Sequence, residues 1–530
     1  MSQWALLQAL LIDTVESQPE KMALMIGHQQ YTYQDVMTMA VATSHVFRRK
    51  GLTRGARVAI QADNSLTTII AFWATLLSDG IVTLLANDLQ EDKIQFILQD
   101  AGAIFYVTPR IRQSLRDTLK NNAILKTIFT PALTPTKEDD LLYALEVDGF
   151  LAANHASTYP KLPVFKNNEL DLAAILYTSG STGEPKGVML THRNMLAAAS
   201  SIIQYLHYQK TDVILSALPL SFDYGLYQMI MAFGVGALLV LERDALWPAQ
   251  ILKKIQDEKV TVLPCVPTLL NVLIEHANRY RFDYTSLRAI TNTAAALTKK
   301  HITHIKEIFQ KAAIFSMYDL TECKRCTYLP PEMIDIKPDS VGIAIPNTEL
   351  WIVDENHQVL GCNQVGQLVI RGATVMRGYW NNPVETNKKL KEGPVPGEKV
   401  LYTGDYALLD EDGYLYFKGR MDEVVKYKGV KVSPIEIELI ISRLPAIREV
   451  SVLTMTDEND TQLFIIVALH REHALTQIEA ELMIKHALPK SQHPSQILIV
   501  DNLPKNNNGK IDKKSLQSSV KDTYFIIKES

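Results

Sequence analysis

A chain of 530 residues is longer than one compact domain usually is, so two or more domains are expected. With 47% hydrophobic and 21% charged residues and no low-complexity tract, the composition is that of a globular protein with a large core. The net charge of −4 comes from interspersed acidic and basic residues, which argues against nucleic acid as a partner.

Two apolar segments decide whether the chain carries a targeting or membrane segment. Met1–Leu11 lacks a basic region and a small-residue cleavage site, so it predicts an amphipathic helix and not a signal peptide. Leu226–Leu241 is short for a membrane span and is interrupted by Gln228, Gly234 and Gly236, so it predicts a buried helix followed by a buried strand. No membrane partner is expected.

Short apolar runs alternate with helical patterns over the first two thirds of the chain. The predicted strands are Arg57–Gln61, Ile104–Val107, Ala173–Tyr177, Val213–Ala217, Ala237–Leu241, Val260–Leu263 and Ala313–Met317. The predicted helices are Tyr33–Arg49, Leu66–Leu77, Asn194–Tyr205, Thr268–Ala277 and Thr298–Phe309. This alternation predicts α/β layers with parallel strands.

After Asn347 the pattern changes twice. Closely spaced short strands predict a β-rich subdomain: Glu349–Val353, Gly366–Ile370, Leu401–Tyr402 and Tyr414–Phe417. A small, mobile α+β domain is predicted to follow, with helices at Pro434–Arg443 and Gln477–Leu488 and strands at Val450–Leu453 and Leu463–Leu469. We therefore divide the chain into a large domain of residues 1–421 and a small domain of residues 422–530.

The four cysteines give no metal or redox signature. Cys323 and Cys326 have CxxC spacing, but Cys265 and Cys362 do not form the second pair that a zinc site needs. No thioredoxin-like unit surrounds the pair either. Free thiols favour a reducing, cytoplasmic location.

A glycine-rich segment, Tyr177–Gly187, follows a predicted buried strand. Its glycines allow close backbone approach, and its hydroxyl and N–H groups can surround phosphate oxygens, with Lys186 as a point charge. The order of residues does not match G-x-x-x-x-G-K-[ST], so a Walker-type NTPase is not supported. A flexible loop has a similar composition, but the length and order of this segment favour a phosphate-binding loop.

The segment Thr178–Gly187 resembles the phosphate loop of the adenylate-forming superfamily, which includes acyl-CoA synthetases, nonribosomal-peptide adenylation domains and luciferases. Further motifs of that superfamily follow in family order: Tyr318–Glu322, Leu401–Asp405, Gly419–Gly429 with Val432–Glu438, and Pro504–Lys510. The resemblance implies an AMP-forming acid–thiol ligase, which activates a carboxylic acid with ATP as an acyl-adenylate and passes the acyl group to a thiol.

The resemblance also implies roles for individual residues. The pyrophosphate part of ATP would be held by Thr178, Ser179, Gly180, Ser181, Thr182, Gly183 and Lys186. Thr321 would contact the α-phosphate and Glu322 would bind Mg²⁺. Tyr318 would stack on adenine, and the remaining ATP-binding positions are Phe417, Asp405 at the ribose and Arg420 at ribose or phosphate.

Two positions of the small domain are expected to act in sequence. Lys510 would contact the substrate carboxylate and the α-phosphate oxygens in the transition state of adenylation. Asp422 matches the family hinge, about which the small domain rotates after adenylation. The rotation would replace Lys510 by the face carrying Val425–Gly429, so that one site performs both half-reactions.

The acid pocket is expected around Leu218–Gln228, which resembles the acid-pocket helix of the family. In amino-acid-activating members of the family the aspartate of this segment pairs with the substrate ammonium, so the resemblance implies that Asp223 does so here, with a helix-capping role as the alternative. A carboxylate in an apolar pocket is costly unless a cation pairs with it, which agrees with that role. The other predicted wall residues are Tyr224, Tyr227, Pro264, Thr291, Thr293, Met317, Arg325 and Cys326. If Arg325 points inward, an acidic substrate is favoured.

The segment Thr321–Pro331 resembles free-standing proline ligases that load a carrier protein in nonribosomal-peptide and secondary-metabolite biosynthesis, and also exosortase-associated acyl-CoA ligases. L-Proline is the predicted substrate and the phosphopantetheine thiol of a separate carrier protein the predicted acceptor, since little chain follows Lys510. An acyl-CoA ligase for a non-amino acid is the alternative. A catalytically inactive scaffold is a third.

One residue departs from the family motif. Asp319 stands where the family usually has glycine, and it is expected to add negative charge beside ATP. On that interpretation Asp319→Gly would leave activity equal or raised.

Overall fold

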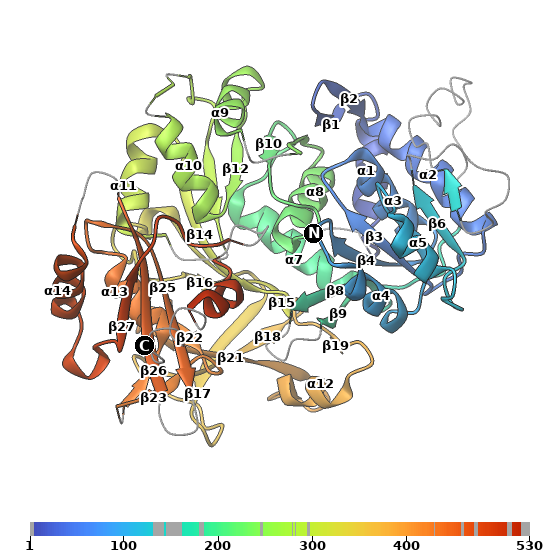
Figure 1. Ribbon diagram of the computed structural model, residues 1–530. Coiled ribbons are helices and arrows are strands. Elements are labelled where there is room, and N and C mark those ends of the chain that lie inside the picture. The colour runs from blue at the N-terminus through green and yellow to red at the C-terminus, as the bar shows by residue number, and fades with distance from the viewer. Residues whose placement is uncertain are drawn as a thin grey trace.

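The structure is a computed structural model. It describes residues 5–130, 142–144, 162–179, 185–243, 247–277, 279–280, 282–293, 297–428, 430–456, 461–470, 475–505 and 511–520. Figure 1 shows two helix-covered sheets in the upper part of the molecule, a β-rich unit below them, and the C-terminal strands and helices at the lower left.

The first sheet has eight strands in the order β19-β9-β8-β4-β3-β5-β6-β7. Their bounds are Gly378–Tyr379, Pro185–Thr191, Leu172–Ser179, Ile81–Ala86, Arg57–Ala62, Ala103–Val107, Thr127–Thr130 and Leu142–Ala144. The strands from β8 to β7 are parallel, whereas β9 and β19 are antiparallel additions. The predicted phosphate loop therefore belongs partly to a hairpin, because Thr178 pairs with Lys186 across β8 and β9.

The second sheet has nine strands in the order β16-β15-β14-β13-β12-β10-β11-β1-β2. Their bounds are Ile343–Ala344, Cys323–Leu329, Ala313–Leu320, Ala289–Asn292, Val262–Cys265, Val213–Ser216, Leu238–Leu241, Met22–Ile26 and Gln29–Thr32. The strands from β14 to β1 are parallel, and both edges are antiparallel. The prediction of α/β layers with parallel strands is confirmed, although β12 lies two residues beyond the predicted Val260–Leu263.

Helices cover these sheets and pack between them. The helices of the large unit are α1 Ala9–Ser17, α2 Tyr33–Arg49, α3 Leu66–Leu77, α4 Glu91–Asp100, α5 Gln113–Leu119, α7 His192–Leu206, α8 Asp223–Val235, α9 Pro248–Asp257, α10 Pro267–Ala277 and α11 Lys299–Ile308. Thr32 caps α2 through a capping box and Ser65 caps α3, so both begin where the sequence predicts.

Leu226–Leu241 is the predicted buried helix and strand, α8 and β11. The predicted helix Met1–Leu11 is wrong in its bounds: residues 1–4 lie outside the described part, and α1 begins only at Ala9.

The β-rich unit and the C-terminal part follow. The β-rich sheet has the order β17-β18-β21-β20, with β22 beside β21, and the bounds Thr348–Val353, Gly366–Gly372, Lys399–Leu409, Leu390–Glu392 and Leu415–Arg420; α12 is Pro383–Lys389. The C-terminal elements are β23 Val425–Tyr427, β24 Val430–Val432, α13 Pro434–Ile441, β25 Ile447–Thr456, β26 Thr461–Leu469, α14 Gln477–Ala487 and β27 Gln496–Ile499. Their hydrophobic cores begin at Tyr427, whereas the main core ends at Leu415. This separation agrees with the boundary at Asp422, which stays a prediction.

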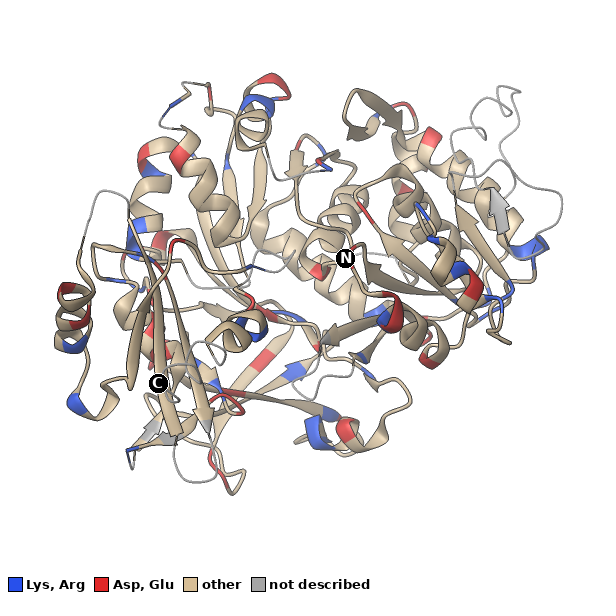
Figure 2. Ribbon diagram, viewed as in Figure 1, with Lys and Arg blue, Asp and Glu red and all other residues tan. Residues whose placement is uncertain are grey.

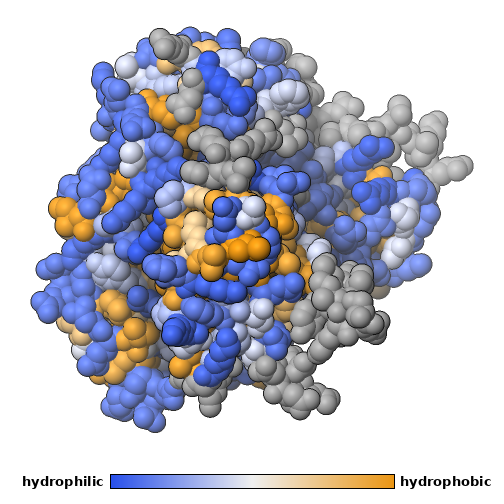
Figure 3. All heavy atoms as spheres, turned by 60° about the vertical axis from the view of Figure 1, so that its left-hand side comes forward, coloured by the Kyte–Doolittle hydropathy of each residue, from blue (hydrophilic) through white to orange (hydrophobic). Residues whose placement is uncertain are grey.

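The surface carries both signs of charge. Figure 2 shows Lys and Arg next to Asp and Glu in all parts of the ribbon. On the face seen in Figure 3, hydrophilic residues predominate and hydrophobic residues form separate groups, the largest near the middle of the view. Within the described residues, no helix combines the length and hydropathy that crossing a bilayer would require.

Candidate active site

The predicted site residues meet where the two α/β sheets approach the β-rich unit. Thr321 and Glu322 form the two-residue turn between β14 and β15, so they project from the end of the second sheet. The backbone N–H of Met376 donates to the Glu322 carbonyl at 2.8 Å and fastens this turn to the segment between β18 and β19. Ligands of open α/β sheets bind at such carboxyl ends of strands.

Tyr318, Phe417, Asp405 and Arg420 form one group. The rings of Tyr318 and Phe417 have centroids 5.7 Å apart, and the Tyr318 hydroxyl donates to the Asp405 carboxylate. Arg420 Nε lies 3.0 Å from Asp405 Oδ1. Burial raises the pKa of Asp405 to about 6, although Arg420 and the Tyr318 hydrogen bond oppose the shift. The group presents an aromatic face next to a buried carboxylate.

Lys186 and Glu322 lie on either side of Tyr379. The Tyr379 hydroxyl donates to Glu322 Oε1 at 2.7 Å, and Lys186 Nζ lies 5.9 Å from the Tyr379 ring centroid. Lys186 also forms an ion pair with Glu385 at 2.6 Å, and this bond holds the pKa of Glu385 at about 2. Neither Tyr379 nor Glu385 was predicted as a site residue, because nothing in the local sequence links them to a lysine about 200 positions earlier.

The acid side contains a buried group of four charges, Asp223, Asp319, Lys324 and Arg325. Lys324 Nζ lies 3.0 Å from Asp223 Oδ2 and 2.7 Å from Asp319 Oδ2, with its side chain only 2% exposed. Arg325 approaches Asp319 to 3.7 Å. Burial opposes ionisation of Asp319, but Lys324 and Arg325 outweigh it and place the pKa of Asp319 below its usual range.

The remaining predicted wall residues surround this group. Tyr224 and Thr291 share a hydrogen bond of 2.6 Å, and Pro264 pairs with Thr291 across β12 and β13. Arg325 lies over the Tyr224 ring with its Cζ 5.0 Å from the centroid. The other neighbours are Tyr227, whose ring centroid is 5.4 Å from Lys324 Nζ; Met317, which accepts from Tyr205 at 3.1 Å; and Cys326, which donates to the Cys323 carbonyl at 3.3 Å. Phe222 occupies the N-cap of α8 and Asp223 is the first residue of the helix, so Asp223 is not the N-cap residue.

The structure revises the interpretation of Asp319. Its carboxylate accepts from Thr293 at 2.6 Å and pairs with Lys324 and Arg325, so its charge is neutralised within the acid side of the site. The negative charge expected at this position is therefore present, but two neighbouring cations balance it. Lys324 was not predicted as a site residue, because neighbouring strand residues usually face opposite ways.

Comparison with known proteins now identifies the family. The model of the AMP-binding enzyme family matches residues 11–380, and the model of the AMP-binding enzyme C-terminal domain matches residues 436–510. The chain belongs to the AMP-binding enzyme family. It is an adenylate-forming, AMP-forming acid–thiol ligase.

Curated relatives of this AMP-binding enzyme fall into two classes. Gramicidin S synthase 2 of Brevibacillus brevis is 28% identical over 96% of this chain, which spans only 11% of that synthetase. The long-chain-fatty-acid–CoA ligase of Bacillus subtilis is 27% identical over 98% of this chain and 95% of its own length. The chain is therefore about equally similar to a part of a gramicidin synthase and to a CoA ligase over nearly its whole length.

Solved structures have the same fold. ATP-bound MatB from Rhodopseudomonas palustris superimposes with a TM-score of 0.84 at 25% identity, covering 98% of this chain and 99% of that one. The anthranilate CoA ligase AuaEII in complex with anthranoyl-AMP gives a TM-score of 0.84 at 22% identity, covering 98% of both chains. The predicted fold class, a large N-terminal domain with a small C-terminal domain, is confirmed.

Part of the predicted site lies outside the described residues. This applies to Gly180, Ser181, Thr182, Gly183, Lys510 and the side chain of Ser179. Thr178 lies near the end of β8, and Asp422 is half-exposed, with its Oδ1 3.5 Å from Arg420 Nε.

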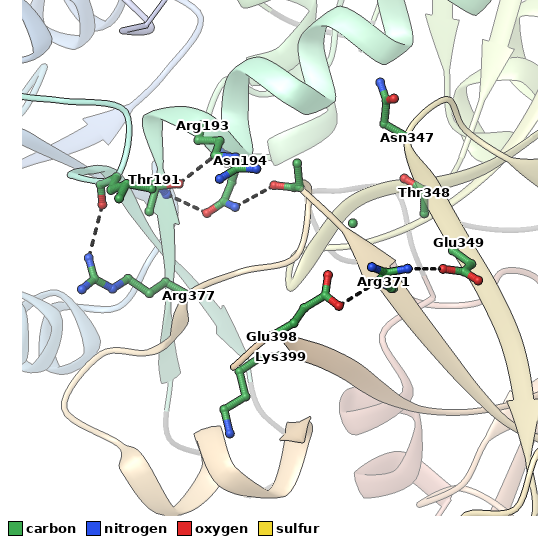
Figure 4. Close-up of a pocket in the computed structure, with 13 residues that line it drawn as sticks. Thr191, Arg193, Asn194, Asn347, Thr348, Glu349, Arg371, Arg377, Glu398 and Lys399 are labelled. Atoms are coloured by element: carbon green, nitrogen blue, oxygen red, sulfur yellow. Dashed lines mark hydrogen bonds and ion pairs between the residues drawn. The ribbon is translucent and has the colours of Figure 1, made fainter. Parts of the chain in front are cut away.

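A cavity of about 810 Å³ opens elsewhere, lined by residues of α7, of β18 and of the segment between β18 and β19. Asn194 donates to the carbonyl of Ala373 at 2.7 Å there (Figure 4). It also donates to the carbonyl of Val375 at 2.9 Å. Arg371 bridges Glu349 and Glu398, both at 2.8 Å. None of the predicted site residues lines this cavity.

Proposed function

We propose that this AMP-binding enzyme activates an amino acid as an aminoacyl-adenylate, with Asp223 as the anchor of the substrate ammonium. The observation that carries this proposal is the placement of Asp223 at the first turn of α8, with its side chain only 9% exposed. Within the described residues, Lys324 is the ion-pair partner of its carboxylate, through Oδ2. Oδ1 is therefore available to accept from a substrate N–H group.

The nucleotide side supplies the rest of the adenylation site. The rings of Tyr318 and Phe417 would hold adenine, and the buried Asp405 carboxylate would accept the ribose hydroxyls. Thr321, Arg420, Lys186 and the glycine-rich loop would contact phosphate oxygens. The substrate carboxylate attacks the α-phosphorus of ATP, and the bond to pyrophosphate breaks. Lys510 would stabilise the charge of that transition state, an effect worth about 10²–10³ in rate.

The residues present fit one Mg²⁺ ion shared with ATP. Glu322 offers a carboxylate, the oxygen ligand that Mg²⁺ prefers, and Tyr379 orients it. Within the described ranges, no cluster of three or more acidic, His or Cys side chains suits a metal ion, so the ion would take its other ligands from phosphate oxygens and water. Its chemistry would be to screen the phosphate charge from the incoming carboxylate.

The second half-reaction transfers the acyl group to a thiol. A thiolate attacks the acyl carbonyl carbon, and AMP leaves as the bond between the carbonyl carbon and the phosphate oxygen breaks. We propose that Asp422 is the hinge that exchanges Lys510 for the face of Val425–Gly429, and that the thiol is the phosphopantetheine of a separate carrier protein. Four free cysteines, one exposed, favour a reducing compartment and hence the cytoplasm.

ATP–pyrophosphate exchange across the standard amino acids tests this proposal, with L-proline first because the segment Thr321–Pro331 resembles proline ligases. The deaminated analogue of each amino acid is the matched control. Exchange with an amino acid, none with its analogue, and a large loss in Asp223→Asn are expected. Exchange with the analogues alone would contradict the amine anchor.

One observation favours a second candidate, an acyl-CoA ligase for a non-amino acid. Lys324 already supplies a cation to Asp223 at 3.0 Å, so the carboxylate does not need a substrate ammonium for neutralisation. In that case deaminated acids would support thioester formation with CoA, and Asp223→Asn would change the activity little.

A further inference from the structure

A bulge in the hairpin of β14 and β15 shapes the acid side of the site. Tyr318 pairs with Thr327 and Leu320 with Cys323, so Asp319 alone lies opposite Lys324, Arg325 and Cys326. Arg325 adopts a φ of 59°, in the left-handed region that side chains other than glycine rarely enter. Bulges of this kind redirect side chains next to active sites. As a result, the neighbouring Lys324 and Arg325 both lie buried against Asp319.

The two cations of this group are not equally satisfied. Lys324 lies within 3.0 Å of both Asp223 and Asp319. The Arg325 side chain is 0% exposed, stands 3.7 Å from Asp319, and its three guanidinium nitrogens make no hydrogen bond to any described residue. Its five N–H donors are thus buried beside the Tyr224 ring, and the Asp319 carboxylate at 3.7 Å forms an ion pair but is too far for a hydrogen bond. Buried donors of native proteins almost always have partners.

A second buried donor lies in the same group. The hydroxyl of Tyr227 also has no hydrogen-bond partner among the described residues. Tyr227 is fully buried, and its ring centroid is 5.4 Å from Lys324 Nζ. Burial and the neighbouring Asp223 raise the pKa of its hydroxyl, so the hydroxyl keeps its proton as a donor. A guanidinium and a phenol hydroxyl without partners together call for a group that accepts hydrogen bonds and carries negative charge.

We propose that the acid substrate carries a second carboxylate, distal to the one that is adenylated, which binds the guanidinium of Arg325. This inference names the substrate class of the proposed activity and rests on acid activation at this pocket. If Asp223 also binds a substrate ammonium, the substrate is an amino acid with an acidic side chain. If it does not, the substrate is a dicarboxylic acid. L-Proline has no such group, so it ranks below the acidic substrates.

Isosteric pairs test the inference on the wild-type enzyme. ATP–pyrophosphate exchange is measured with aspartate and asparagine, glutamate and glutamine, and glutarate and its monoamide, with L-proline alongside. An acid preferred over its amide by roughly tenfold or more in kcat/KM is expected, since hydrogen bonds between charged groups are the stronger ones. A preferred acid without a second carboxylate, L-proline included, would overturn this inference and leave acid activation standing. Silence with every acid would overturn both.

Two substitutions, Arg325→Met and Arg325→Lys, test whether Arg325 causes the preference for the acid over its amide. The Met variant should bring the acid-to-amide ratio to about one, and the Lys variant, which keeps the charge without the planar fork, should keep part of it. Arg279→Met, at an exposed arginine paired with Glu275, is the matched control and should keep the full ratio. The shift of Tm that AMP causes shows whether each variant is folded. If a folded Arg325→Met variant keeps the acid-to-amide ratio of the wild type, the inference is overturned.

Discussion

The nucleotide side and the acid side of the site differ in how their residues reach their positions. On the nucleotide side, Tyr318, Asp405 and Arg420 lie within strands, Asp405 and Arg420 are cross-strand partners, and Tyr318 and Arg420 both contact the Asp405 carboxylate. On the acid side, four buried charges are joined by an irregular hairpin. The order of the family motifs therefore predicts which residues meet on the nucleotide side. The acid side depends instead on the bulge between β14 and β15, which the alternation of side chains along a strand does not predict.

The largest effect is expected from a substitution on the acid side, and it concerns stability. Asp319→Gly removes the carboxylate shared by Lys324 and Arg325, and losing one partner of a buried ion pair costs about 3–5 kcal/mol. We expect the free energy of unfolding in urea to fall by about that amount, and less in Asp319→Asn, which can still accept from Thr293. A stable Asp319→Gly variant with equal or raised activity would restore the sequence-based interpretation.

Lys510→Ala tests the catalytic step that both sides share. We expect ATP–pyrophosphate exchange to fall by about 10²–10³, because the lysine would act only as charge develops in the transition state. Lys514→Ala, at an exposed lysine of the same region, is the control and should retain exchange. Equal rates in the two variants would remove Lys510 from the mechanism.

Asp405→Asn probes the nucleotide side. Replacing a charged acceptor of the ribose hydroxyls costs about 1.5–3 kcal/mol, so KM for ATP should rise roughly 10-fold to 100-fold. If KM stays at the wild-type value, the ribose contact is wrong.

The carboxyl group of Asp405 is also expected to make stability and ATP affinity depend on pH. Its pKa is raised from 3.8 to about 6 in the folded protein, so protonation favours the folded state, and this contribution to stability is lost as the pH rises through about 6. Ribose binding needs the ionised form, so affinity for ATP should weaken as the pH falls below about 6. The Asn variant should show neither change, and a pH-independent KM in the wild type would contradict this assignment.

The smallest effect concerns Glu385, the partner of Lys186. Partly exposed ion pairs contribute about 0–1 kcal/mol, so Glu385→Gln should change KM for ATP by about fivefold at most. A reduction would show that Glu385 restrains Lys186 from phosphate. Glu349→Gln, which removes an ion pair at the separate cavity, should leave KM unchanged.

The sequence predicts most of the fold because its signals are local. The helix Tyr33–Arg49 has a helical apolar period and a capping threonine at Thr32, so its bounds match the structure. The strand Pro185–Thr191 was missed because glycines and Lys186 hide it behind a loop-like composition. Tyr379 and Glu385 reach the site only through the tertiary fold, and the buried position of both Lys324 and Arg325 needs the bulge. No local pattern in one sequence encodes these contacts.

The proposed adenylation of an amino acid anchored by Asp223 predicts which acids the enzyme activates. It is tested most directly by supplying ATP with an equimolar mixture of the standard amino acids and their deaminated analogues, trapping the adenylates with hydroxylamine, and identifying the hydroxamates by mass spectrometry. We expect one dominant aminoacyl hydroxamate in the wild type and its loss in Asp223→Asn. Products from deaminated acids alone, formed equally by both proteins, would contradict it.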